Sequence, residues 1–367
     1  MSRRIAIARV ICILAVIYVH SPPYGDRVPV TLLSVDGATW IMREILARSS
    51  VPLLSIVSGF LTVRLDAGSY ADRLRKKVKT LLVPLVLWNL IAVAKDSVAA
   101  GGALPALADL PQLLLGITGN PRIYPLYFLR DIFVCNLLLP LFLFGIARSP
   151  RLTLALLLAD AVTNADGVLF TNSAIPLFFA VGLALGSRQL TATAMMRQPA
   201  LWAACAAIVL VAIAAMPFVF GVSARHWPGM IENAVVVVQR VAGAILFWHA
   251  AGMAMNRPVG RIARRIEPII FFVFCSHPLL LGGAWAVFQA ATGGAGAAGT
   301  IAFFFASPVI VLLLSIVAIA ALMATVPWLL RTLMAGRTPS WAQLRALATM
   351  RDVPPRPPRP LPSDRAI

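Results

Sequence analysis

The sequence predicts an all-α integral membrane protein, and its composition, its apolar run lengths and the placement of its basic residues all favour this class. Of the 367 residues, 60% are hydrophobic and only 13% are charged, whereas a soluble domain carries about a quarter charged residues. Too few polar residues remain to cover a soluble surface, which excludes an ordinary cytoplasmic enzyme and a disordered protein. The net charge of +18 does not indicate a nucleic-acid partner, because the basic residues lie between apolar runs rather than on a hydrophilic surface.

Ten apolar segments are candidates for membrane spans, which need about 17–25 mostly apolar residues. They cover residues 5–21, 46–64, 80–99, 125–146, 152–164, 174–188, 200–220, 231–254, 268–290 and 300–330. The fifth and sixth are short, which suggests tilted, re-entrant or broken helices covered by protein or by a water-filled cavity. The first resembles a signal peptide in its basic start, but Arg9 interrupts it and no small-residue cleavage site follows, so a retained span is favoured.

The basic residues alternate along the chain as the positive-inside rule requires. With a cytoplasmic N-terminus, 23 of the 32 Lys and Arg residues fall in inside loops and the tail, and six fall in outside loops. We therefore expect about ten spans in a multi-span domain over residues 1–331, with both termini cytoplasmic. Residues 332–367 are expected to form a basic, proline-rich cytoplasmic tail near anionic membrane lipid, with one short amphipathic helix over residues 341–350.

The first span holds the most informative pair of polar residues. Arg9 and His20 are eleven residues apart, close to three helical turns, so they share nearly one face about 16 Å apart along the axis. An ionisable group at mid-membrane costs about 2.5–3.5 kcal/mol on insertion scales, which makes function the default hypothesis. The alternative is that Arg9 extends to lipid phosphate and His20 lies at the outer interface.

Other spans carry isolated ionisable residues. His277 lies near mid-depth in the ninth span, directly before a proline, where a helix break is the alternative explanation. In the eighth span Arg240 and His249 fall on different faces, so only one is expected to face the interior. Arg130 and Asp131 are adjacent in the fourth span and are expected to point apart, with separate partners. The four cysteines lie in apolar spans without paired spacing, so neither a disulfide framework nor a metal site is expected.

Six segments, taken in order, resemble the membrane acyltransferase-3 family over nearly the whole chain to about residue 330. They are Arg9 to His20, Ser58-Gly59-Phe60, Lys76 to Trp88, Pro125 to Asp131, Ile175 to Phe179 with Gly182, and Phe274 to Leu281. Three positions depart from the family pattern. Tyr127 stands where Trp is usual, Lys79 stands where Arg is common, and Pro278 follows the late histidine. Each motif is weak alone, but their order on an independently derived ten-span topology is specific.

The resemblance implies an enzyme of the bacterial inner membrane that moves an acetyl or other acyl group from acyl-CoA to a sugar hydroxyl. The acceptor would be an exopolysaccharide or its lipid-linked precursor, as for xanthan-type acetyltransferases, and no permanently bound cofactor is expected. The donor would be held by Arg9, Arg73, Lys76, Lys77, Lys79 and Ser58, although Ser58 is at least as well explained by packing. Guanidinium groups can pair with the phosphates of CoA through two hydrogen bonds.

Four residues are assigned to the chemistry. His20 would take the proton of the sugar hydroxyl, or would itself carry the acetyl group covalently. Arg130 would hold the sugar or its phosphate carrier, or stabilise the oxyanion. Asp131 would orient an imidazole, and Arg9 would serve the donor. Tyr127, His277 and Arg240 are expected near the substrate.

The competing class is a transporter or flippase for a lipid-linked sugar, which would show repeats and discontinuous helices. No repeat is visible.

Overall fold

The computed structural model describes residues 2–22, 34–65, 69–165, 169–220, 229–294 and 296–349, and within these ranges the protein is helical throughout, without a β-strand. The first half contains α1 Ser2–Val19, α2 Val35–Trp40, α3 Val51–Leu65, α4 Tyr70–Lys77, α5 Val83–Ala99, α6 Leu110–Leu115, α7 Tyr127–Leu137, α8 Leu139–Arg148, α9 Pro150–Thr163 and α10 Ala174–Gly186. The second half contains α11 Thr193–Arg197, α12 Pro199–Phe220, α13 Gly229–Ala254, α14 Pro258–Ile266, α15 Ile270–Thr292, α16 Ala297–Thr325, α17 Pro327–Leu333 and α18 Trp341–Thr349.

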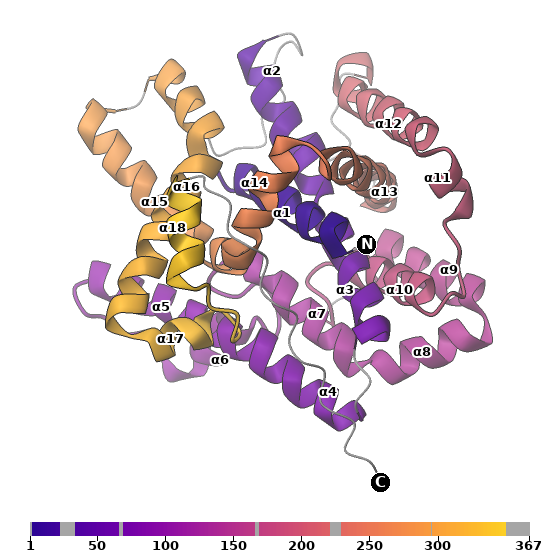
Figure 1. Cartoon of the computed structure of the whole chain (residues 1–367), viewed down its shortest axis with the longest axis horizontal. Coiled ribbons are helices and arrows are strands. Elements are labelled where there is room, and N and C mark those ends of the chain that lie inside the picture. The colour runs from indigo at the N-terminus through magenta and orange to yellow at the C-terminus, as the bar shows by residue number, and fades with distance from the viewer. Residues whose placement is uncertain are drawn as a thin grey trace.

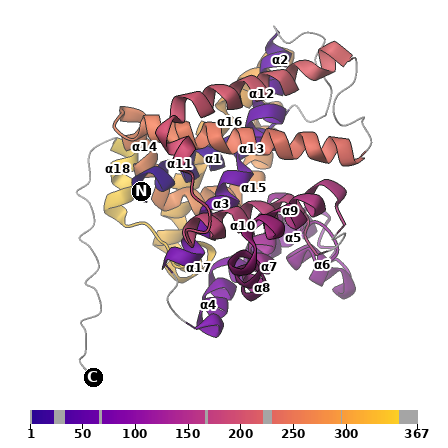
Figure 2. The ribbon, with the colours of Figure 1, turned by 90° about the vertical axis from the view of Figure 1, so that its right-hand side faces the viewer.

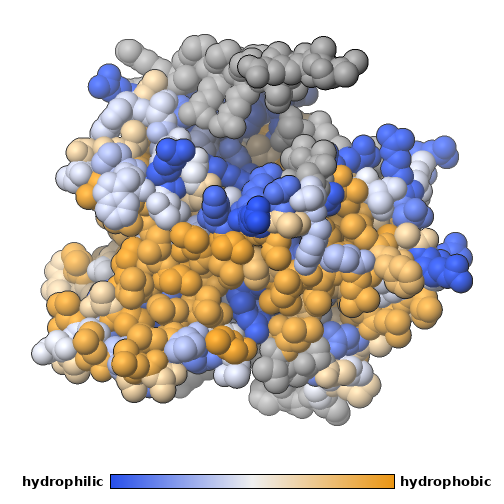
Figure 3. All heavy atoms as spheres, turned by 90° about the horizontal axis from the view of Figure 1, so that it is seen from below, coloured by the Kyte–Doolittle hydropathy of each residue, from blue (hydrophilic) through white to orange (hydrophobic). Residues whose placement is uncertain are grey.

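Six continuous helical stretches of the described chain are long and apolar enough to cross a membrane. They are Val35–Arg64, Tyr70–Ala99, Pro199–Val219, Gly229–Ala254, Pro258–Thr292 and Ala297–Thr325. A seventh span is possible if α7 and α8 count as one helix, although they meet at an angle of 61°. The bend follows from Pro140 near the start of α8, because proline cannot supply the N–H that would continue α7. Figure 3 shows a broad hydrophobic band across the face it displays, with hydrophilic residues gathered along one side.

Length and composition alone thus identify six or seven spans among the described residues and do not confirm the expected ten. The segments expected over residues 152–164 and 174–188 form α9 and α10, which have 14 and 13 residues. Both are shorter than the roughly 20 residues that a perpendicular span requires. The first helix, α1, carries three arginines among its 18 residues. It lies in the centre of the molecule rather than at its rim (Figure 1).

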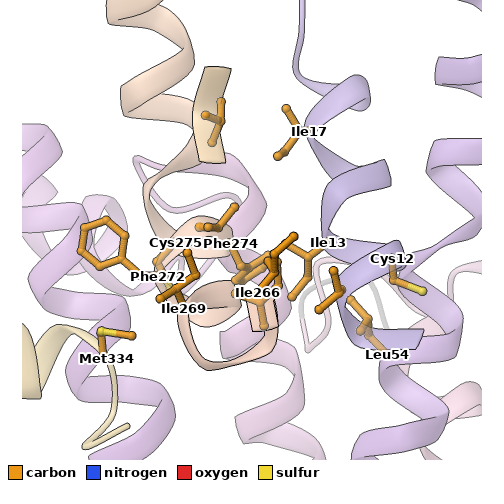
Figure 4. Packing of buried hydrophobic residues seen from close by; sticks show 14 of the residues in the cluster. Cys12, Ile13, Ile17, Leu54, Ile266, Ile269, Phe272, Phe274, Cys275 and Met334 are labelled. Atoms are coloured by element: carbon orange, nitrogen blue, oxygen red, sulfur yellow. The ribbon is translucent and has the colours of Figure 1, made fainter. Parts of the chain in front are cut away.

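The core forms around α1. Its buried side chains, which include Ile7, Cys12 and Ile17, pack with Leu54 of α3 and with α14 and α15 (Figure 4). Arg4 near its N-terminus donates to the Trp248 carbonyl of α13 and lies 4.2 Å above the Trp248 ring. Because protein surrounds α1 on several sides, its polar residues meet other helices rather than lipid chains.

The α3–α10 crossing brings two backbones into direct contact. A Cβ atom built on Gly59 would lie 2.1 Å from the Phe179 carbonyl oxygen, and one on Gly182 would lie 2.1 Å from the Ile56 carbonyl oxygen. Only glycine permits so close an approach, as is common where membrane helices pack. This contact gives Gly59 and Gly182 a structural role, and it fixes α10 beside α3.

The C-terminal region is attached to this body as far as it is described. The short helix expected from Trp341 is present as α18, and its Leu344 and Ala346 are buried. Leu344 belongs to the same hydrophobic cluster as α1 and α15. The proline-rich segment over residues 354–360 lies outside the described residues. Figure 2 shows α12 and α13 running side by side at the opposite end of the molecule from α4.

Candidate active site

A cavity of about 790 Å³, measured with the open space at its mouth, lies beside the C-terminal end of α1. Its wall is built from α1, α3, α7, α10, α13 and α15 together with their flanking turns, so segments far apart in the sequence meet here. Most of the lining is apolar. The polar side chains are His20, Arg48, Ser55, Tyr124, Tyr127, Asn172 and Arg240. The cavity thus brings together three residues singled out from the sequence, namely His20, Tyr127 and Arg240.

His20 follows directly after α1 and is half-buried. Its turn is held from two sides, because Arg43 donates to the Ser21 carbonyl at 2.7 Å and the Ser21 hydroxyl bonds to that of Ser307 at 2.7 Å. The His20 ring lies 5.3 Å from the ring of His277 and 6.1 Å from the ring of Tyr124, measured between centroids. His20 is therefore positioned by its backbone while its imidazole lines the cavity.

His277 is completely buried on α15 and lies directly before Pro278. Pro278 has no N–H, which leaves the carbonyl of Phe274 without its helical donor. The Nδ1 atom of His277 lies 2.7 Å from that carbonyl oxygen and must carry the proton there, because a carbonyl only accepts. The Nε2 atom consequently keeps a lone pair, and no described residue donates to it. The helix continues through Pro278, so the break considered as an alternative for this position does not occur.

Asp131 and Arg130 pair with each other instead of pointing apart. The Arg130 Nη1 atom donates to the Asp131 Oδ1 atom at 2.8 Å, because the long arginine side chain reaches back to its neighbour. The carboxylate is fully buried and also accepts from the backbone amides of Thr171 and Asn172 at 3.2 and 3.0 Å. Neither residue lines the cavity. Asp131 instead anchors the turn before α10, and this turn places the Asn172 side chain in the cavity wall.

Asn172 connects that turn to α13. Its Oδ1 atom accepts a hydrogen bond from the Arg240 Nη1 atom at 3.0 Å. Arg240, rather than His249, is thus the α13 residue at the cavity. Arg48, Asn172 and Tyr124 were not singled out from the sequence as site residues. No local motif marks them, because their role depends on contacts between distant helices.

A second concave surface, the basic groove, lies between α4 with its following turn and α17. It encloses about 1070 Å³, again including open space, and its charged lining residues are Asp72, Arg75, Lys76, Lys79 and Arg331. Lys76 and Lys79 were expected at the donor. Arg73 and Lys77 lie on α4 but do not line the groove, and Arg331 was not singled out from the sequence.

Arg9 and Ser58 also lie outside both concave surfaces. The Arg9 Nη1 atom forms an ion pair with Glu267 at 2.6 Å, across 258 positions of sequence. Arg337, which follows the groove residue Gly336, lies near enough for its positive charge to repel that of Arg9. The Ser58 hydroxyl donates to the Leu54 carbonyl of its own helix at 2.8 Å, so its predicted contact with the donor stays a prediction.

Comparison with known proteins shows to which family the chain belongs. A family model described as an acyltransferase domain matches residues 3–330. The chain belongs to the acyltransferase-3 family. This acyltransferase is 26% identical over 352 residues to the succinoglycan biosynthesis protein ExoH of Rhizobium meliloti (strain 1021). The aligned region covers 92% of this chain and 93% of ExoH. No solved structure matches it. Together with the apolar helices, the family indicates a multi-pass membrane acyltransferase, as the sequence motifs predicted.

Within this acyltransferase, several family-like segments converge on one place. His20 ends the first segment, Tyr127 lies in the fourth, Ile175 and Phe178 lie in the fifth, and Phe274 begins the sixth; all of them line the cavity. The segment around Gly59 does not line the cavity, but it allows α10 to pack closely against α3. These segments of the sequence therefore either line one cavity or support the helices that line it.

Proposed function

We propose that the protein is a membrane O-acyltransferase that moves an acetyl or other acyl group from acyl-CoA to a sugar hydroxyl of an exopolysaccharide or its lipid-linked precursor. The observation that carries the proposal is the position of His20 in the wall of a cavity in a member of an acyltransferase family. The similarity to a succinoglycan biosynthesis protein supports a polysaccharide acceptor. We further propose ten spans in a bacterial inner membrane, with both termini cytoplasmic and α9 and α10 as the two short members.

The donor is assigned to the basic groove. Arg75, Lys76, Lys79 and Arg331 line it with only one acidic residue, Asp72. Such a surface suits the phosphates of CoA, because guanidinium and ammonium groups form charge-assisted hydrogen bonds with phosphate oxygens. Arg9 lies near Arg337, which follows the groove residue Gly336, and the two cations repel each other. The pantetheine arm would follow α1 from Arg9 toward the thioester at His20.

The chemistry is assigned to His20. Imidazole titrates near neutral pH, so its neutral form can accept the proton of a sugar hydroxyl during attack. In the direct route the sugar oxygen forms a bond to the acyl carbon, the carbon–sulfur bond breaks, and the proton passes from His20 to the thiolate. In the covalent route the imidazole nitrogen attacks the acyl carbon first, and the carbon–sulfur bond breaks to release the CoA thiolate. The sugar oxygen then bonds to the acyl carbon, the carbon–nitrogen bond breaks, and the hydroxyl proton ends on the thiolate.

The proposal is tested with protein purified in detergent. Incubation with labelled acetyl-CoA and lipid-linked oligosaccharide from the producing host is expected to give labelled saccharide and free CoA. A transporter or flippase would give neither product. Mass spectrometry of surface glycans from a deletion strain should show the loss of one acyl group per repeat unit. Unaltered glycans in that strain and no acyl transfer by the purified protein would refute the proposal.

Arg9→Lys is expected to weaken donor use without preventing folding. Lysine keeps the charge and a contact with Glu267, but it cannot bind a phosphate through two parallel hydrogen bonds. We expect the KM for acetyl-CoA to rise about fivefold, close to 1 kcal/mol, with a nearly unchanged melting temperature. Glu267→Gln is the control, because it removes the ion-pair partner but not the guanidinium. Equal KM values for Arg9→Lys and wild-type protein would contradict this role.

His277→Asn is expected to lower kcat while sparing the fold. The asparagine amide can still donate to the Phe274 carbonyl, but the lone pair of Nε2 next to His20 is lost. We expect kcat to fall about tenfold or more, with little change in the KM for acetyl-CoA. Ser276→Ala provides a matched control, because Ser276 is also buried on α15 and its hydroxyl has no partner among the described residues. A similar loss in both variants would show a general packing effect.

A further inference from the structure

Two arginines line the cavity, and only one of them is paired with an acid among the described residues. Arg48 and Arg240 both line it, and no carboxylate is among the lining residues described. Arg48 has a partner, because its Nε atom donates to Glu44 at 2.7 Å. Arg240 differs. Its one hydrogen bond to described residues goes to the neutral Asn172, and it forms no ion pair with any of them.

Asp131, the buried acid behind the Asn172 turn, does not line the cavity and is already engaged. Asp131 is fully buried and accepts from Arg130 and from the two backbone amides before α10. It therefore acts on the turn that carries Asn172 rather than on Arg240. A guanidinium group has five N–H donors, so most of the donors of Arg240 are left for a ligand.

The depth of Arg240 makes this arrangement costly. It lies eleven residues into the 26-residue helix α13, near the middle of a segment that is able to span a membrane. A charged group at that depth normally pairs with another or marks the pathway of a substrate. An anion that enters the cavity would offset this cost and would bind next to His20.

The phosphates of the donor do not account for this charge. The basic groove and the cavity share no lining residue, and they are built from different helices. The anion in the cavity is therefore carried by the other substrate. The rings of Tyr124 and Tyr127, 5.3 Å apart at the cavity wall, add the apolar faces against which a sugar ring packs.

We propose that the cavity selects an anionic acceptor, whose carboxylate or phosphoryl group binds Arg240 while its hydroxyl faces His20. This inference rests on the proposed acyl transfer and specifies its acceptor. The carboxylate would belong to an acidic sugar, and the phosphoryl group to the lipid carrier of the saccharide. Both anions use the same guanidinium chemistry.

The test measures binding, so it does not depend on turnover. Full-length protein in detergent is titrated in thermal-shift experiments with two matched pairs of probes, cellobiouronic acid against cellobiose and undecaprenyl phosphate against undecaprenol. We expect at least one anionic probe to bind about tenfold more tightly than its neutral partner. Arg240→Gln should remove this preference, and Arg240→Lys should retain part of it. Arg148→Gln, at an exposed position at the end of α8, is the control and should behave as wild type.

Each outcome decides between sources or overturns the inference. A preference for the uronate alone identifies an acidic sugar, and a preference for the phosphate alone identifies the lipid carrier. Equal binding of charged and neutral probes by the wild type, or a preference that survives in Arg240→Gln, overturns the proposal. If Arg240→Gln does not fold, Arg240→Lys and the wild-type comparison still decide. Acetyl transfer measured in parallel separates failure of the proposed function from failure of anion selection.

Discussion

His20→Gln is expected to reduce acyl transfer at least about a hundredfold. Glutamine fills the space of the imidazole, but it cannot accept and return a proton near neutral pH. His20 makes no hydrogen bond with another described side chain, and its turn is held by Arg43 and Ser307 through Ser21. The variant should therefore insert and fold normally. Acyl content of the polymer is measured by mass spectrometry, and transfer by purified protein is measured with labelled acetyl-CoA.

A matched variant makes this result specific. Tyr18→Phe removes a polar atom two residues earlier, whose weak contact with the Phe305 carbonyl at 3.5 Å contributes little. It should leave transfer nearly unchanged. Normal acylation by His20→Gln at normal protein level would defeat the assignment of His20. A labelled acetyl group trapped on the wild-type enzyme and absent from the variant would favour the covalent route over direct transfer.

Gly182→Val is expected to prevent correct assembly of the helices. Even the Cβ atom would meet the Ile56 carbonyl oxygen at 2.1 Å and the Phe60 amide nitrogen at 2.8 Å, and these are backbone atoms that no rotamer change can move. The two helices would have to separate, which costs about 3 kcal/mol or more. We expect loss of monodisperse protein in detergent or a large drop in melting temperature.

The control for this prediction comes from α15. A Cβ atom at Gly282 or Gly283 meets no other atom within 4 Å, so Gly282→Ala and Gly283→Ala should be recovered like the wild type. Gly59→Ala tests the same crossing from the other helix, because its Cβ atom would meet the Phe179 carbonyl oxygen. Wild-type melting temperatures for Gly182→Val and Gly59→Ala would show that α3 and α10 do not need this close approach.

The helical class was accessible from the sequence, because it depends on local patterns of apolar residues. Apolar run length predicted most helices, including the short α9 and α10. The spacing of Arg9 and His20 predicted one helix for both, whereas His20 lies one residue beyond the end of α1. Pro140 explains why the fourth expected span is bent, but the angle between its halves depends on what packs around them. The number of spans was harder to predict, since short apolar helices satisfy the same composition whether or not they cross a membrane.

The partners of the site residues were not accessible in this way. Glu267 pairs with Arg9 across 258 positions, and no periodicity connects them. Adjacent Arg130 and Asp131 were expected to diverge, yet the flexible arginine side chain returns to its neighbour. The proton on His277 is determined by a carbonyl that Pro278 leaves free, which requires a continuous helix to be known first. Asn172 has no motif at all, and only the buried Asp131 explains its place.

The central helix α1 also has a consequence for the evolution of the enzyme. Arg9 and His20 are separated by eleven residues of nearly unbroken helix, a rise of about 16 Å. Under the proposed function, the length of α1 sets the distance between Arg9 and His20, and this distance must match the length of the pantetheine arm. Its apolar residues can be exchanged as long as they fill the same volume, but an insertion or deletion would change the distance and the angular alignment together. The composition of this helix is therefore free to drift, whereas its length is not.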